Sequence, residues 1–327
     1  MRCPTTGYVV VMAAPGSGPS LTHAALLYES EDQFLDAAIP FLRQGLDGGQ
    51  PTVLCLGDAE RQLILDELGS AVGLTEIPAW SSSTPFATLR SNHRLIREHT
   101  SKVSSHVRIL GEVPYRDNPA AWVGWIRYET AVNQLFADLA VTMLCPYNRR
   151  MTHSTVLDDI VRSHQFLCPE GRGHRNPKFV EPTKFLDDLA ARDLDPIENE
   201  PPAITLHDQR PTVSRAAVGA LADAASFDPS VVEDLVLALG EVITNAIVSG
   251  RPPVVVRVWA PPDRIVVAVE DHGPGPDDPF VGMLPATGTR YGGLGLHIAY
   301  QLCGLVTLSR HPSGFTVHLT MHRSTTA

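Results

Sequence analysis

Short apolar runs alternate with longer amphipathic stretches over the first half of the chain, from Thr22 to about Cys168. The short runs are rich in strand-favouring residues and cover residues 23–28, 51–57, 107–113 and 139–147. The stretches between them have the length of helices and open on Ser, Asp or Pro; they cover residues 31–45, 58–69, 84–102 and 119–136. This alternation predicts an α/β domain of three layers with a mostly parallel sheet.

The pattern changes in the second half of the chain. Residues 176–211 are rich in proline and lose hydrophobic periodicity, which indicates a semi-rigid connector. Beyond it we expect helices at 213–225, 229–249 and 292–303, strands at 254–260 and 264–270, and a closing hairpin around Pro312, Ser313 and Gly314. The chain is therefore expected to hold an α/β domain at 20–180, a linker at 181–203 and an α+β domain at 204–323.

Composition and charge narrow the class of protein. With 43% hydrophobic and 19% charged residues over 327 positions, the chain is globular and long enough for two domains. Its formal net charge of −10 argues against direct contact with nucleic acid, which requires clustered Lys and Arg. No run approaches the roughly 18 apolar residues of a membrane span, and the first 20 residues indicate a disordered leader rather than a signal peptide.

The cysteines point to a reducing compartment. All five are scattered without CxxC spacing, which predicts no disulfide framework and a cytoplasmic protein. Two of them fall close to three histidines in a set that suggests zinc: Cys145, His153, His164, Cys168 and His174. The set lacks the paired short loops of a zinc knuckle, so ordinary structural residues are favoured and a zinc site stays open.

Three motifs in order carry the chemistry. Glu241 and Asn245 are four residues apart on one helix face, where an amide oxygen can bind Mg²⁺ and a carboxylate can accept a proton. Asp271 follows a strand and can accept from an adenine amino group, and Gly273 and Gly275 allow close approach of the backbone. Residues 292–296 (Gly-Gly-Leu-Gly-Leu) then open a helix, whose free N–H groups attract phosphate.

These motifs resemble the N, G1 and G2 boxes of the GHKL superfamily of ATPases, which includes gyrase, heat-shock chaperones, histidine kinases and mismatch-repair proteins. Residues 237–250, 269–279 and 292–309 look most like actinobacterial anti-sigma factor kinases of the switch-protein type. The resemblance implies a GHKL ATPase sandwich that binds ATP and Mg²⁺. Many relatives have His-Ala or His-Gly after the N box, where this chain has Ser249-Gly250.

The same resemblance assigns roles to residues. It implies that Glu241 is the general base, Asn245 the Mg²⁺ ligand and Asp271 the adenine contact. Gly273 and Gly275 would shape the adenine pocket, and Thr316 would join its water network. Arg290, at the end of a lid at 280–291, would contact the γ-phosphate. The residues that would surround the phosphates are Gly293, Leu294, Gly295 and Leu296.

The first domain resembles another family. Residues 22–57 and 122–148 are similar to the MEDS sensory domain, a RecA-like α/β unit with no P-loop, and no P-loop motif occurs in this chain. The resemblance makes His23, Tyr28, Cys145 and Tyr147 candidate sensory residues. The carboxyl ends of parallel strands should bring Cys55, Glu112, Tyr115 and residues 145–147 to one rim.

A MEDS domain joined to an anti-sigma-type ATPase resembles anti-sigma regulatory factors of the RsbA type. That resemblance implies a cytoplasmic regulator that binds a sigma factor and phosphorylates a STAS-type anti-anti-sigma antagonist on Ser or Thr, and it leaves a homodimer open. Two alternatives remain: a stoichiometric anti-sigma binder that uses ATP structurally, and a sensor histidine kinase. A sensor histidine kinase is disfavoured, because the sequence has no long helical hairpin carrying a His followed by an acid before Val213.

Overall fold

The computed structural model describes residues 20–69, 72–77, 84–102, 106–114, 122–169, 173–285 and 294–323. The chain divides into two compact units, Met1–Phe185 and Leu186–Ala327. Among the described residues, no helix combines the length and apolar character that a membrane crossing requires.

The first unit is built around a seven-stranded sheet in the order β3-β2-β4-β5-β1-β6-β7. All neighbouring strands are parallel except β7, which is antiparallel to β6. The strands are β1 (Leu21–Tyr28), β2 (Thr52–Cys55), β3 (Leu74–Glu76), β4 (Val107–Gly111), β5 (Val141–Asn148), β6 (Phe166–Pro169) and β7 (His174–Arg175). The helices are α1 (Glu31–Asp47), α2 (Asp58–Leu68), α3 (Pro85–Lys102), α4 (Trp122–Leu135) and α5 (Ser154–Ser163). The predicted α/β class with a mostly parallel sheet is confirmed.

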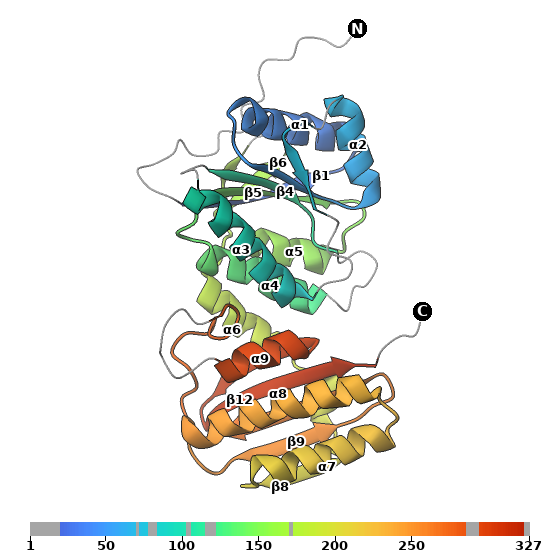
Figure 1. Ribbon diagram of the computed structural model, residues 1–327, viewed down its shortest axis with the longest axis vertical. Helices are drawn as coiled ribbons and strands as arrows, with labels where there is room; N and C mark the ends of the chain where they lie inside the picture. Colours follow the sequence, from blue (N-terminus) through green and yellow to red (C-terminus); the bar gives the residue numbers. More distant parts are fainter. Residues whose placement is uncertain are drawn as a thin grey trace. The chain divides into compact units, whose positions relative to one another are not determined.

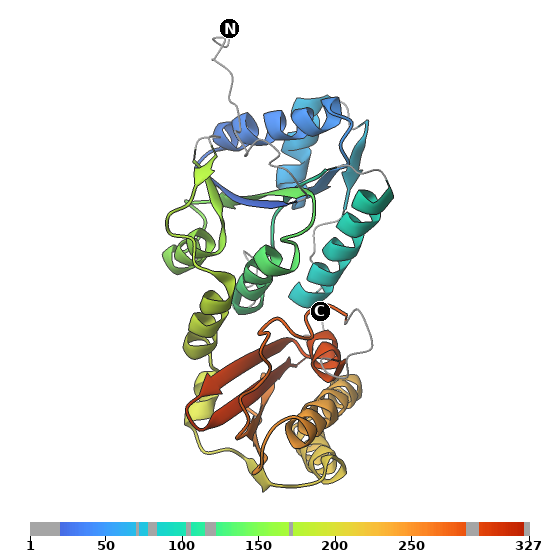
Figure 2. The ribbon, with the colours of Figure 1, turned by 90° about the vertical axis from the view of Figure 1, so that its left-hand side faces the viewer.

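Two layers of helices cover this sheet (Figures 1 and 2). On one face, Ala24 and Leu26 of β1 share a core with Phe34 of α1 and Ile64 of α2. On the other face, His23 of β1 meets α4. Because successive side chains of a strand alternate between faces, β1 contributes apolar residues to one core and a polar residue to the other.

The second unit is an antiparallel sheet in the order β11-β12-β10-β9-β8, with helices on one face (Figure 1). Its strands are β8 (Ile204–His207), β9 (Val255–Trp259), β10 (Arg264–Asp271), β11 (Leu305–His311) and β12 (Gly314–His322). Its helices are α7 (Pro211–Ala224), α8 (Pro229–Val248) and α9 (Leu294–Leu302). Asp228 caps α8 by accepting a hydrogen bond from Ser230 N at 2.9 Å. The predicted α+β sandwich is confirmed.

The segment predicted as a linker, 181–203, is largely folded. It contains α6 (Pro182–Arg192), in which Phe185 and Leu189 are fully buried, and the 3₁₀ helix η2 (Pro196–Asn199). Pro182 and Pro196 occupy the first positions of these helices, where a missing N–H breaks no intrahelical bond. The prolines that suggested a connector are therefore compatible with helix starts.

The 3₁₀ helix η2 covers part of the sheet face that the helices leave free. Ile197 packs against Trp259, Val266 and Ala268. The carboxylate of Asp195 receives two hydrogen bonds from the Arg264 guanidinium, at 2.5 and 2.7 Å. Residues 195–200 thus belong structurally to the second unit.

We expect Asp195→Asn to lower the free energy of unfolding of the second unit by about 0.5–1 kcal/mol at neutral pH, after allowance for solvent screening of this partly exposed pair. The hydrogen bonds from Arg264 lower the pKa of Asp195, so the stabilisation is present above the carboxyl's ordinary pKa of about 4 and is lost as pH falls through its lower folded value. Urea unfolding at neutral and acidic pH measures the difference. Asp263→Asn, which changes a more exposed partner of Arg264, is the control and should cost less.

Candidate functional site

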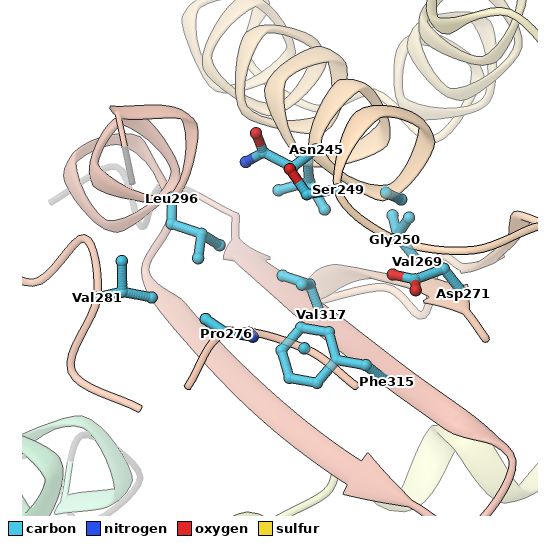
Figure 3. Close-up of a pocket in the computed structure, with 13 residues that line it drawn as sticks. Asn245, Ser249, Gly250, Val269, Asp271, Pro276, Val281, Leu296, Phe315 and Val317 are labelled. Carbon is cyan, nitrogen blue, oxygen red and sulfur yellow. The ribbon is translucent and has the colours of Figure 1, made fainter. Parts of the chain in front are cut away.

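A cavity of about 200 Å³ lies between α8, the ends of β10 and β12, and α9 (Figure 3). Its lining is mostly apolar, with polar groups from Asn245, Ser249 and Asp271. The other lining residues are Val242, Ala246, Gly250, Val269, Gly275, Pro276, Val281, Leu296, Phe315 and Val317. An apolar pocket with a few convergent polar groups is typical of a site for a small organic ligand.

Asp271, the last residue of β10, is fixed at one end of the pocket. Its Oδ1 atom accepts hydrogen bonds from Gly273 N at 2.6 Å and Arg251 N at 3.2 Å, and the side chain is buried. An ionised carboxylate has about four acceptor positions. Asp271 therefore keeps the capacity to accept from a ligand while the backbone holds its orientation.

Two glycines lie against this carboxylate, and a third lies against the Phe315 ring. A Cβ atom at Gly250 would lie 2.5 Å from Asp271 Oδ1, and one at Gly273 would lie 2.6 Å from it. Gly275 has a φ of 71°, which favours glycine, and a Cβ there would overlap the Phe315 ring. The structure therefore places Gly273 beside Asp271 and Gly275 in the pocket lining, and it adds Gly250, which sequence reasoning did not assign to the site.

The N-box residues meet the start of α9. A Cβ atom at Gly295 would lie 2.7 Å from Asn245 Nδ2 and 3.2 Å from Glu241 Oε2, so both side chains converge on this glycine. Asn245 lines the cavity, whereas Glu241 lies one helical turn away, beside Gly295 and outside the lining. The unpaired N–H groups and positive dipole end of α9 suit a phosphate here.

The other residues predicted to contact the phosphates lie in different surroundings. Leu296 lines the cavity, and Leu294 is 67% exposed. Gly293 and Arg290 lie outside the described residues. The spacing of the motif alone did not reveal which leucine faces the pocket.

The described part of the predicted lid is anchored to α9. The Gly282 carbonyl accepts a hydrogen bond from His297 Nδ1 at 2.8 Å, and Phe280 and Met283 are buried. The Nε2 atom of His297 faces Gln301 Nε2 at 2.6 Å, which fixes the proton on Nδ1. His297 was not predicted; its place on the buried face of α9 was the only signal.

Thr316 lies on the opposite face of the sheet from the cavity. It is paired with Glu270 in the β-ladder, whereas its neighbours Phe315 and Val317 line the pocket. The Thr316 hydroxyl meets His311 Nε2 at 3.0 Å. Strand alternation explains this placement, which turns Thr316 away from the pocket. It assigns the pocket lining on β12 to Phe315 and Val317, which were not predicted.

Of the sensory candidates, the structure brings three together. His23, Cys145 and Tyr147 point to the same face of the first sheet, where they meet Glu129 and His164. Tyr28 lies five residues after His23 and points to the other face, where its ring centroid is 5.1 Å from that of Phe34. An odd separation within a strand places two side chains on opposite faces.

The ionisation of this cluster follows from its burial. Burial and neighbouring His23 lower the pKa of His164 to about 3, so this imidazole is neutral near pH 7. Burial acts to raise the pKa of Glu129, but the contact with His23 acts in the other direction and prevails, so the pKa is lowered. A neutral imidazole and an ionised carboxylate therefore face each other in the protein interior.

The set suggested as zinc ligands is not assembled as proposed. His153 caps the exposed start of α5, His174 lies in an exposed strand, and Cys168 is in the core on the other face of the sheet. Of these five residues, only Cys145 and His164 come together.

At the rim predicted for the carboxyl ends of the parallel strands, Glu112 N donates a hydrogen bond to Cys55 O at 2.9 Å. Tyr115, also expected there, lies outside the described residues.

Two family models match the chain. Residues 22–165 match the MEDS model, the MEthanogen/methylotroph, DcmR Sensory domain. Residues 205–321 match the Histidine kinase-like ATPase domain. Both resemblances found in the sequence are thereby confirmed. A search of curated proteins found no match.

Two solved structures are similar to parts of the chain. The RsbU and RsbW domains of Rv1364c from Mycobacterium tuberculosis are 22% identical, with a TM-score of 0.28, over 38% of this chain and 34% of that one. The flagellar accessory protein FlaH from Methanocaldococcus jannaschii is 15% identical, with a TM-score of 0.29, over 47% of this chain and 73% of that one. The chain thus spans 34% of the first protein, and likenesses of this size carry no information about activity.

We expect Gly250→Ala to destabilise the second unit by about 1–3 kcal/mol, because the added methyl group would lie 2.4 Å from the Ala246 carbonyl oxygen and 2.5 Å from Asp271 Oδ1. Gly304→Ala is the matched control, since the nearest atom to its Cβ would be Thr320 O at an ordinary 3.4 Å. Urea unfolding of the two variants and the parent chain gives the comparison. Equal stability of the two variants would show that the packing of Gly250 on Asp271 is not tight.

Proposed function

Because the chain joins a MEDS sensory domain to a histidine kinase-like ATPase domain, we propose that it is a cytoplasmic, ATP-binding anti-sigma factor whose ATPase unit is a Ser/Thr kinase under sensory control. The observation that carries the ATP assignment is the fixed carboxylate of Asp271 at the end of an apolar pocket. The kinase activity, its substrate and the sigma factor go beyond the family matches.

Adenine fits the pocket by shape and by hydrogen bonding. Its flat, apolar faces suit the apolar lining of this pocket, which includes Val242 and Ala246 of α8 and Phe315 and Val317 of β12. Its amino group is a donor, and Asp271 presents an acceptor held by two backbone N–H groups. A site that pairs a buried acceptor with one donor rejects ligands that lack that donor, because the acceptor would remain unpaired.

The phosphates belong at the other end of the pocket, where α9 begins. Gly295 allows the start of α9 to approach the pair Glu241 and Asn245 closely, because a Cβ atom there would overlap Asn245 Nδ2. The residues present therefore fit Mg·ATP, with Asn245 as the protein ligand that would hold Mg²⁺, which would offset phosphate charge. Arg290 and Gly293 stay proposed phosphate contacts outside the described residues.

Glu241 is the proposed general base. Its carboxylate lies beside Gly295, next to the end of the helix where the phosphates are placed. A Ser or Thr hydroxyl of the antagonist would attack the γ-phosphorus; its oxygen forms the new P–O bond, the bond to ADP breaks, and the hydroxyl proton passes to Glu241. The partners, a sigma factor and a STAS-type antagonist, rest on the resemblance to anti-sigma regulatory factors.

The stoichiometric alternative rests on Ser249-Gly250, which replaces the His-Ala or His-Gly of many relatives. Ser249 lines the pocket, and Gly250 provides the space for Asp271. The replacement is therefore compatible with ATP binding.

Asp271→Asn should weaken ATP binding by about 10- to 100-fold, because the amide keeps an oxygen for the two backbone N–H groups but presents a donor to the adenine amino group. Calorimetric titration of the full chain with Mg·ATP measures the loss. Glu270→Gln is the matched control: it changes the preceding residue, whose side chain pairs with Arg257 on the other face. Unchanged affinity in a folded Asp271→Asn protein would contradict the adenine site.

Glu241→Gln should retain ATP and lose phosphoryl transfer by about 10²- to 10⁴-fold, because the amide preserves shape but accepts no proton. Labelled ATP with a STAS-type antagonist gives the transfer rate, and titration gives the affinity. If the parent chain binds a sigma factor but transfers no phosphate, the stoichiometric alternative is correct.

A further inference from the structure

Four side chains with metal-ligand atoms converge inside the first unit. They are His23 from β1, Glu129 from α4, Cys145 from β5 and His164 directly after α5, and all four are buried. One ligand atom from each lies within 4.8 Å of all the others. They come from four elements that the chain brings together on one face of the sheet.

Hydrogen bonds outside the cluster fix the protons of both imidazoles. Asn133 Nδ2 donates to Glu129 O at 3.0 Å and to Ser163 O at 2.7 Å, so the Asn133 Oδ1 atom is the one that faces His23 Nδ1 at 3.2 Å. His164 Nδ1 lies 2.8 Å from the carbonyl oxygen of Ile160. Both Nδ1 atoms therefore donate, and in the neutral rings both Nε2 atoms carry lone pairs.

Those lone pairs point at a carboxylate oxygen. Glu129 Oε2 lies 3.0 Å from His23 Nε2 and 3.6 Å from His164 Nε2. Within the described residues, His164 Nε2 has no hydrogen-bond partner although it is fully buried, and Glu129 Oε2 accepts a hydrogen bond from His23 only if His23 Nε2 carries a proton. A single proton could bridge Glu129 to one ring only, and the other would still present a lone pair to an acceptor. A cation between them satisfies all of these atoms.

The ligand set and its spacing indicate which cation. We propose that His23, Glu129, Cys145 and His164 bind one zinc ion in a closed tetrahedral site. Zinc favours imidazole, thiolate and carboxylate together, and bonds of about 2.0–2.3 Å give a tetrahedron with edges of roughly 3.3–3.8 Å. The His23 Nε2 to Cys145 Sγ distance of 3.5 Å and the His164 Nε2 to Glu129 Oε2 distance of 3.6 Å fall in that range, whereas the His23 Nε2 to Glu129 Oε2 distance of 3.0 Å would have to lengthen slightly around an ion.

Charge supports the same assignment. One thiolate and one carboxylate balance a divalent ion, so the loaded site is neutral overall and can lie in a dry interior. Tyr147 donates its hydroxyl to the second carboxylate oxygen of Glu129 at 2.7 Å. Asn133 orients His23, the Ile160 carbonyl orients His164 and Tyr147 orients Glu129. Hydrogen bonds of this kind commonly fix the ligands of metal sites.

This inference concerns the sensory domain and does not rest on the proposed ATPase function. Because its ligands come from β1, β5, α4 and the end of α5, the ion would tie this helix layer to the two central strands. Loss of the ion would release that connection.

The test uses the full chain, purified without chelators from zinc-supplied cells. Elemental analysis should find about one zinc per chain in a closed four-ligand site. Cys145→Ser and His164→Gln should each lose most of it, while Cys168→Ser, a control at another buried cysteine of the same sheet, and His153→Asn, at an exposed histidine, should keep it. Circular dichroism confirms that each variant is folded.

Cobalt gives a second readout that a misfolded variant cannot imitate. Cobalt added to metal-free protein should produce the visible bands of a tetrahedral site and a thiolate-to-metal band that is absent in Cys145→Ser. Tyr147→Phe should keep the bands and weaken metal affinity by about 10- to 100-fold. Folded parent protein with neither zinc nor cobalt bands, or full zinc retention in both ligand variants, would overturn the proposal. Iron lost from the same variants would overturn its assignment to zinc.

Discussion

Successive side chains of a β-strand point to opposite faces of its sheet, and both candidate sites in this protein depend on that alternation. In the second unit it sends Asp271, Phe315 and Val317 into the pocket and Thr316 away from it. In the first unit it separates the polar His23 from Tyr28, which joins the apolar core with α1 and α2. A shift of one residue in either ladder would exchange pocket residues for residues of the opposite face.

Local signals in the sequence were sufficient for most of the long helices and strands, but not for α6 and η2, which lie in the segment expected to be a linker. Asn245, Asp271 and Gly275 line one pocket and Glu241 lies beside Gly295, because each motif occupies one helix or one strand end. Contacts between distant segments had no such signal. His23 and Cys145 are 122 positions apart, and Glu129 looked like one more acid on an amphipathic helix, so nothing in their spacing marked a cluster.

The glycines of the pocket show how separate motifs constrain one another. Gly250 at the end of α8 and Gly273 after β10 contact the same oxygen of Asp271, so a side chain at either would displace the same carboxylate. The departure from relatives at Ser249-Gly250 is therefore coupled sterically to the G1 box. A side chain introduced at Gly250, after the N box, would therefore disturb Asp271 in the G1 box.

Because η2 packs on the sheet of the second unit, it limits where a fragment that contains only this unit can begin. The family match starts at residue 205, after Ile197, Asp195 and the Glu200 carbonyl, which contacts the Trp259 indole N–H at 2.8 Å. A fragment cut at that point would expose the apolar surface of Trp259, Val266 and Ala268 to water and would leave Arg264 without its Asp195 partner. Exposed apolar patches on a sheet favour self-association. A fragment that keeps this cover therefore has to begin ahead of Asp195, inside the segment that the sequence suggested was a connector.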